Sequence, residues 1–150
     1  MSMTVRKVES RDEDAWTRLY AEYRAFYRLQ EDQSAVATTW RWVRDGEHGL
    51  LGLVAVDDRD QSVALANLRW FARPSTGSMG LYLDDLFTAP AARGAGAAGS
   101  LVQAAAAYAG EAGASVVRWI TAADNATARS VYEAYAVATP WVTYDMKPVS

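Results

Sequence analysis

Cysteine is absent from this chain of 150 residues, and histidine occurs once, as His48. The lack of cysteine excludes disulfides, thiolate metal ligands and a covalent acyl-cysteine intermediate. With a single histidine, a metal site would have to be built mostly from carboxylates. We therefore expect no metal, and we expect any group transfer to proceed without a cysteine nucleophile.

Long apolar runs and clusters of positive charge are also missing. No run approaches the roughly 20 residues that a membrane-spanning helix needs, and residues 1–10 lack the pattern of a secretory leader. The formal net charge is −3, and the lysines and arginines are scattered, which argues against nucleic acid as a main partner. These absences favour a soluble cytoplasmic protein that binds neither membrane nor nucleic acid.

What remains is a chain that is 51% apolar by count, enough for one well-packed core, so we expect a single domain over residues 1–150. A possible capping box at Ser10–Glu13 and an aromatic stripe through Tyr27 predict the first helix. The other predicted helices cover residues 34–44, 96–110 and 125–136. The predicted strands cover residues 4–8, 49–56, 63–71, 81–88, 115–121 and 141–146. The order βααβββαβαβ predicts an α+β fold with a mixed, mostly antiparallel sheet and about four helices on its two faces.

The most informative segment lies between Tyr82 and Tyr108, where a strand (YLDDLFTAP) is followed by a glycine loop (ARGAGAAG) and a helix. Such a loop can bind phosphate groups, because its backbone N–H groups point outward and the helix dipole favours negative charge. Gly94, Gly96 and Gly99 match the dinucleotide pattern G-x-G-x-x-G. The same letters match R-x-x-G-x-[G/A], a pyrophosphate loop, through Arg93.

The nucleotide alternatives fit the rest of the chain poorly. A dinucleotide site needs an acidic residue about twenty positions after the loop, at the end of the next strand, yet the stretch Val116–Thr121 has no acid and the next one is Asp124. A phosphate-loop NTPase needs Lys-Ser/Thr after the second glycine of GxxxxG, where Ser100 and Leu101 stand.

The RGAGAAG loop after LDDLFTAP, the segment DNATARSVYEAY and the predicted order of elements together resemble the GNAT superfamily of N-acetyltransferases. The resemblance covers nearly the whole chain. The acidic pair before Leu-Phe and the motif AxxYRAFYR resemble the branch with diamine, D-amino-acid and histone-acetyltransferase-like members. The resemblance implies acetyl-CoA as acyl donor, a small amine such as a polyamine or amino acid as acceptor, and a homodimer. A non-catalytic acyl-CoA-binding module and an enzyme acting on protein amines are the alternatives.

Transfer to an amine requires a base, because a free alkyl amine, with a pKa of about 10.4, is mostly charged at neutral pH. The candidates are Asp84 and Asp85, whose side chains we expect on opposite faces of the predicted strand. The resemblance implies that Asp84 deprotonates the amine, usually through water, and that Asp85 contacts the acceptor, although family members commonly have Glu at the first position. Both could instead be structural carboxylates.

The departing thiolate needs a proton, and a neutral phenol can supply it. The resemblance assigns this role to Tyr132 and a cofactor contact to Asn125, which could equally be a helix cap. It also implies that main-chain N–H groups around Phe87 polarise the thioester. The implied cofactor-binding residues are Leu86, Phe87, Thr88, Arg93, Gly94, Ala95, Gly96, Ala97, Ala98, Gly99, Asn125 and Ala128.

The acceptor pocket is the least determined part of the sequence. Aromatic faces and carboxylates both favour a cation, and such residues gather in the first helix and near the acidic pair. The candidates for contacting the acceptor are Asp85, Tyr23, Tyr27 and Tyr82, with Glu31, Asp32 and Trp70 as possible further lining residues.

Overall fold

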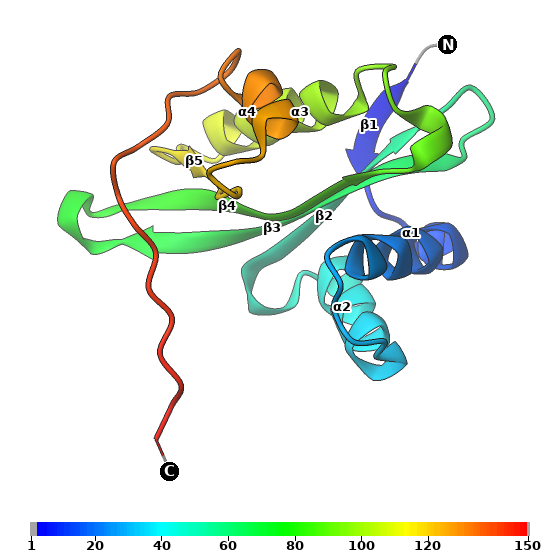
Figure 1. Cartoon of the computed structure of the whole chain (residues 1–150), viewed down its shortest axis with the longest axis horizontal. Coiled ribbons are helices and arrows are strands. Elements are labelled where there is room, and N and C mark those ends of the chain that lie inside the picture. The colour runs from blue at the N-terminus through cyan, green and yellow to red at the C-terminus, as the bar shows by residue number, and fades with distance from the viewer. Residues whose placement is uncertain (1–2, 150) are drawn as a thin grey trace.

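The computed structural model describes residues 3–149 and shows one α+β domain (Figure 1). Its elements, apart from short 3-10 turns, are β1 (Thr4–Lys7), α1 (Glu13–Phe26), α2 (Gln33–Asp45), β2 (Leu50–Val56), β3 (Ser62–Arg73), β4 (Ser78–Thr88), α3 (Ala97–Glu111), β5 (Val117–Arg118) and α4 (Ala126–Tyr132). None of the helices in the described residues is long and apolar enough to cross a membrane.

The five strands form one sheet in the order β1-β2-β3-β4-β5. Neighbouring strands are antiparallel except β4 and β5, which run parallel. Helices α1 and α2 cover one face of the sheet, and α3 and α4 cover the other (Figure 1). The predicted mixed, mostly antiparallel sheet with helices on both faces is confirmed.

The face under α1 and α2 has an aromatic core. The helical spacing of Trp16, Leu19 and Tyr20 puts these side chains on the buried side of α1, where they share a core with Trp40 of α2 and Val54 of β2. Burial of large aromatic side chains is the main source of stability in such a core.

Local signals fix the ends of the first two helices. Helix α2 begins where the Asp32 carboxylate accepts the Ala35 N–H at 2.9 Å, and it ends at Gly46 in the left-handed conformation (φ 69°). Before α1, the expected capping box at Ser10 and Glu13 is wrong by one residue. The N-cap is Glu9, whose N–H donates to the carboxylate of Asp12, three residues on, at 2.7 Å.

The core under α3 is made of smaller side chains. Helix α3 buries Ala97, Leu101, Ala105 and Ala109 against the sheet. Since alanine adds little bulk, the helix can lie close to the strands that lead to the glycine loop. The first turn of α3 follows the glycine loop, which itself follows β4.

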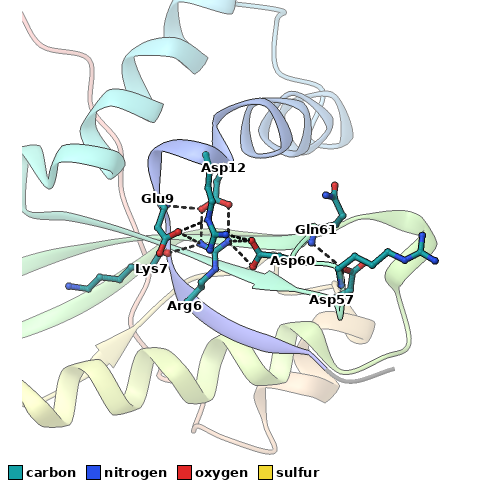
Figure 2. Close-up of polar contacts among 9 residues, drawn as sticks. Arg6, Lys7, Glu9, Asp12, Asp57, Asp60 and Gln61 are labelled. Carbon is teal, nitrogen blue, oxygen red and sulfur yellow. Dashed lines mark hydrogen bonds and ion pairs between the residues drawn. The ribbon is translucent and has the colours of Figure 1, made fainter.

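A buried ion pair joins three separate segments at one end of the sheet (Figure 2). Arg6 of β1 donates to both oxygens of Asp12, at 2.7 and 2.9 Å, and to Asp60 at 3.2 Å. Asp60 lies in the β2–β3 hairpin, whose turn is held by Gln61 donating its N–H to the Asp57 carboxylate at 3.0 Å. Burial works to raise the pKa of Asp12, but the hydrogen bonds from Arg6 and the Glu9 backbone outweigh it and lower that pKa.

The C-terminal part of the chain departs from the sequence prediction. Strand β5 covers Val117–Arg118 instead of residues 115–121, and the predicted final strand at residues 141–146 is absent from the described chain. Residues 137–149 have no assigned secondary structure, and the side chains of Trp141 and Tyr144 are 83% and 91% exposed. A strand pattern becomes a strand only beside a hydrogen-bonding neighbour, and the single chain provides none along this segment.

Candidate active site

The two adjacent aspartates lie on the same face of the sheet, so the prediction that they leave opposite faces is wrong. The register pairs Leu68 with Leu83 but Asn67 with Asp85, which leaves Asp84 as one extra residue in β4. This is a β-bulge, and it interrupts the alternation of side chains. Both carboxylates therefore lie on the α1 side of the sheet, and β-bulges commonly re-aim side chains next to active sites.

Asp85 is held by two neutral donors. The Tyr20 hydroxyl and the Asn67 side-chain amide each donate to its Oδ2 at 3.0 Å. Asn67 is 1% exposed, and its Oδ1 has no hydrogen-bond partner among the described residues. Burial and then the negative charge of Asp85 raise the pKa of Tyr20 and of Tyr23. Both phenols are therefore protonated and able to donate.

Asp84 has a different partner. Arg69 Nε donates to its two oxygens at 3.2 and 2.9 Å, and the Arg69 guanidinium lies 4.5 Å above the Tyr82 ring. The side chain of Asp84 is 32% exposed. Burial raises the pKa of Asp84 despite the opposing effect of Arg69, and the nearby charge of Asp85 adds to the rise.

A row of tyrosines runs along α1 from the Asp85 carboxylate. Along α1, the rings of Tyr20 and Tyr23 are stacked with centroids 5.4 Å apart, and Tyr23 and Tyr27 follow at 4.9 Å. Tyr27 also contributes, after burial, to the raised pKa of Tyr132 on α4. We call Tyr20, Tyr23 and Tyr27 the tyrosine row. It begins at Asp85, to which the Tyr20 hydroxyl donates, and β4 beyond Tyr82 has no residue of β5 paired with it.

Tyr132 is a half-buried phenol at the end of α4. Its ring meets Trp119 edge-on, with centroids 5.4 Å apart. Burial is the main cause of its raised pKa, with a further contribution from Tyr27. The hydroxyl is therefore protonated over the physiological range and available as a proton donor.

Asn125 caps helix α4, since its side-chain oxygen accepts the Ala128 N–H at 3.2 Å. The cap was one of two alternatives for this residue. It fixes the start of the helix that carries Tyr132 two turns later.

The glycine loop has room for a ligand at two of its glycines. Gly94 and Gly96 have φ of +89° and +85°, and a Cβ at either would meet no atom within 4 Å. Glycine is therefore required there by backbone conformation, and the space beside the backbone is open. Gly99 differs, because a Cβ there would lie 2.7 Å from the Tyr135 hydroxyl. Its small size lets Tyr135, just after the end of α4, pack against the first turn of α3.

Arg93 lies toward the α1 side of the loop. Its Nε donates to the Thr88 carbonyl at 3.3 Å, and its guanidinium lies 5.5 and 5.7 Å from the ring centroids of Phe26 and Phe87. The side chain thus connects the end of β4 to the end of α1.

Some predicted lining residues are elsewhere. Trp70 packs against the core under α3, on the face opposite Tyr82. Glu31 and Asp32 line a groove between α1 and α2 that includes neither aspartate of β4. These positions were uncertain from sequence because helix and strand periodicity do not say how two helices cross.

Sequence reasoning also missed three polar neighbours of the aspartates. Asn67 and Arg69 are polar residues within the otherwise apolar strand β3, and Tyr20 was assigned only to the apolar stripe of α1. A polar residue in a central strand is a signal that could have been followed, since buried polar groups need partners.

A carboxylate pair, a protonated phenol and a helix opened by a glycine loop, grouped where a sheet parts, are the components of a group-transfer enzyme. Comparison with known proteins identifies the family. Residues 11–136 match the model of the acetyltransferase (GNAT) family. The uncharacterized N-acetyltransferase YhfO of Bacillus subtilis (strain 168) is 33% identical over 135 residues, 87% of each chain. The chain belongs to the GNAT family and is an N-acetyltransferase.

Other similarities support this assignment. The D-amino-acid N-acetyltransferase HPA3 of Saccharomyces cerevisiae is 27% identical over 143 residues, covering 95% of this chain and 89% of that protein. Among solved structures, a probable acetyltransferase matches with a TM-score of 0.85 at 22% identity, over 100% of this chain and 99% of that one. The enzyme AAC(6')-Iy, solved with a bisubstrate analog, matches with a TM-score of 0.83 at 18% identity, over 99% of this chain and 100% of that one. The structural matches confirm the fold.

Proposed function

We propose that this enzyme transfers the acetyl group of acetyl-CoA to a primary amine of a small molecule, of the polyamine or amino-acid type, by direct attack. The observation that carries the proposal is the placement of Asp84 and Asp85 on the α1 side of the sheet, beside the tyrosine row, with the protonated phenol of Tyr132 on α4 at the α3 side. The proton acceptors and the proton donor are thus separate groups, as an amine attack with a sulfur leaving group requires.

Acetyl-CoA, as the donor substrate, supplies an activated acetyl thioester. The loop fits such a donor, because its open glycines leave backbone N–H groups accessible at the start of a helix. We propose that Arg93 and residues 94–99 hold its pyrophosphate, and that the main chain of Leu86, Phe87 and Thr88 binds its pantetheine arm and polarises the carbonyl. Asn125 and Ala128 would contact it from α4.

In this proposal, Asp84 accepts the proton of the amine, usually through a water molecule. The freed nitrogen lone pair forms the new C–N bond as the C–S bond breaks, and Tyr132 gives its proton to the departing sulfur. The excess proton on the new amide nitrogen is lost to solvent, and the Tyr132 phenolate takes a proton back from solvent. The raised pKa of Asp84 makes it a stronger base than an ordinary aspartate. Asp85, Tyr23, Tyr27 and Tyr82 are the proposed contacts of the acceptor.

The acceptor class rests on charge and on the relatives. Carboxylates and aromatic faces on one wall favour a cationic amine. HPA3 is a D-amino-acid N-acetyltransferase, and AAC(6')-Iy is described with an aminoglycoside-based bisubstrate analog. We therefore place small amines ahead of protein amines as acceptors.

The test is release of free thiol from acetyl-CoA with polyamines, L- and D-amino acids, an aminoglycoside and a lysine-rich peptide. We expect turnover with one of the small amines. Turnover with the peptide alone would replace the small-amine proposal by one for protein amines. Acetyl-CoA binding without turnover on the whole panel would contradict it.

The role of Tyr132 gives a sharper test on the acceptor that this panel identifies. Tyr132→Phe should lower kcat by about 10²-fold and leave acetyl-CoA affinity within about twofold, since only the hydroxyl is lost. Tyr135→Phe is the matched control, because Tyr135 contacts Gly99 and is assigned no proton. A Tyr132→Phe enzyme running at the wild-type rate would remove Tyr132 as the acid.

A further inference from the structure

Asp85 accepts its hydrogen bonds from uncharged groups. The Tyr20 hydroxyl of α1 and the Asn67 amide of β3 both donate to one oxygen, Oδ2. Hydrogen bonds aimed at a carboxylate stabilise its charged form. Because neither donor carries a charge, the negative charge of Asp85 is stabilised without being neutralised. Asp84 differs, since its donor is the positively charged guanidinium of Arg69.

The β-bulge in β4 brings the two carboxylates together. In a regular strand, adjacent side chains point to opposite faces, so the sheet would separate the two charges. Here the register leaves Asp84 as an extra residue between Leu83 and Asp85, and both carboxylates lie on the α1 side. A like charge nearby makes a carboxylate hold its proton more tightly. The charge of Asp85 accordingly contributes to the raised pKa of Asp84.

Asn67 is a polar residue in a position that suits an apolar one. It is 1% exposed in the central strand β3, on the face where Leu65 is fully buried. Its Oδ1 has no hydrogen-bond partner among the described residues, which is unfavourable for a buried acceptor. A leucine would avoid this cost. What a leucine would lose is the hydrogen bond that the amide donates to Asp85.

We propose that Asn67 and Tyr20 are positioning residues, which together hold the charged carboxylate of Asp85 beside Asp84. The proposal rests on the proposed function, in which Asp84 accepts the proton of the amine. Neither positioning residue is assigned a contact with the reacting atoms. Each acts through Asp85, whose negative charge favours the arrival of the proton on Asp84, and the bonds made and broken in the acetyl transfer stay the same.

Other titratable and charged groups lie around the two carboxylates on every element packed there. All of them are kept in the variants that test the proposal, so a change at Asp84 can be traced to the network around Asp85. These groups are Tyr23 and Arg24 of α1, Arg69 of β3, Tyr82 of β4 and Arg118 of β5.

The test is the titration of Asp84 in the free enzyme, followed by NMR of its side-chain carboxyl carbon. Asn67→Leu keeps a branched side chain but cannot donate, so the titration midpoint of Asp84 should fall by about half a pH unit. Tyr20→Phe loses only the hydroxyl and should shift the midpoint in the same direction. Leu65→Val is the matched control, because it alters a buried side chain on the same face of β3. It should lower Tm without moving the midpoint.

A double-mutant cycle shows whether the two residues act through Asp85. Asp85→Asn removes the charge and should lower the midpoint of Asp84 by about one pH unit. Adding Asn67→Leu to Asp85→Asn should lower it no further. A second shift of the same size in that background would overturn the proposal. An unmoved midpoint in both Asn67→Leu and Tyr20→Phe would overturn it as well.

Activity separates this proposal from the proposed function. On the acceptor that the panel identifies, the acid limb of kcat/KM should follow the midpoint of Asp84 to lower pH in each variant. A midpoint that moves while the limb stays would remove Asp84 as the base and would still support the positioning of Asp85. A midpoint that stays in place would overturn the positioning, whatever the acceptor panel shows.

Discussion

Two aspartates of this domain have an arginine partner at nearly the same distance, but they differ in the direction of their pKa shift. Asp12 accepts from Arg6 at 2.7 Å and Asp84 from Arg69 at 2.9 Å. The pKa of Asp12 is lowered and that of Asp84 is raised. An ion pair seen in a structure therefore does not by itself say whether a carboxylate is inert or reactive.

The difference lies in the balance between the hydrogen bonds that each carboxylate accepts, which lower its pKa, and its burial, which raises it. Asp12 is 4% exposed, yet it accepts two hydrogen bonds from Arg6 and one from the Glu9 N–H. Asp84 has Arg69 and, beside it in β4, the like charge of Asp85. Donors aimed at the charged form fix Asp12 as an anion, whereas Asp84 is left with a higher proton affinity.

The largest expected effect is on catalysis at Asp84. Asp84→Asn keeps the shape of the side chain but cannot take a proton, so kcat/KM should fall by about 10²–10⁴-fold. Acetyl-CoA affinity, measured by calorimetry, should stay within about twofold. Asp85→Asn is the neighbouring control, and a larger loss there would transfer the role of base to Asp85.

Next in size is the stability held by Asp12. Asp12→Asn leaves the Arg6 charge without its buried partner, which should cost about 3 kcal/mol and lower Tm by roughly 10 °C. Because the folded pKa of Asp12 is lowered, its contribution is complete above the unfolded pKa of about 3.9 and is lost as the pH falls through the folded value.

Chemical unfolding at pH 7 and at pH 3 checks this dependence. The gap between wild type and Asp12→Asn should be largest at pH 7 and shrink in acid. The specific activity of the folded variant should stay at the wild-type level, since Asp12 contacts Arg6 and Glu9 (Figure 2), which have no assigned role in the site. A gap that does not change with pH would show that the substitution acts through packing alone.

The smallest expected effect is a shift in the pH profile of kcat/KM when Arg69 is replaced. Arg69 lowers the pKa of Asp84, so Arg69→Gln should raise that pKa further and move the acid limb of kcat/KM upward by about one pH unit. Arg118→Gln, which removes an arginine over the Phe71 ring, is the control and should leave the limb in place. An unmoved limb in Arg69→Gln would mean that another group titrates in it.

The parts of the fold that follow from short-range patterns were predictable from the sequence. Helix stripes, the hairpin at residues 57–61, and the glycine loop before α3 each depend on neighbours within a few residues. The side of the sheet taken by Asp84 was not predictable in this way, because the bulge is a property of the β3–β4 register. The final strand failed for a similar reason, since a strand forms only beside a hydrogen-bonded neighbour, which its own local sequence does not specify.

The types of residue in the candidate site were more predictable from the sequence than the contacts between them. The seven-residue spacing from Asn125 to Tyr132 predicted a helix that begins at the Asn125 cap and carries the Tyr132 phenol two turns later. The links from Asp85 to Tyr20 and Asn67 join residues 65 and 18 positions apart, and no local pattern encodes such contacts. The roles assigned to the site residues stay predictions until the variants above are measured.

The bulge at Asp84 also has an evolutionary consequence. Removing this one residue would give β4 the regular register, with Leu83 still opposite Leu68 and Asp85 still opposite Asn67. The core contacts on both faces would be kept, and one carboxylate would disappear. A single-codon insertion or deletion thus separates a one-carboxylate sheet from a two-carboxylate sheet, so a lineage could gain or lose the second acid without redesigning the fold around it.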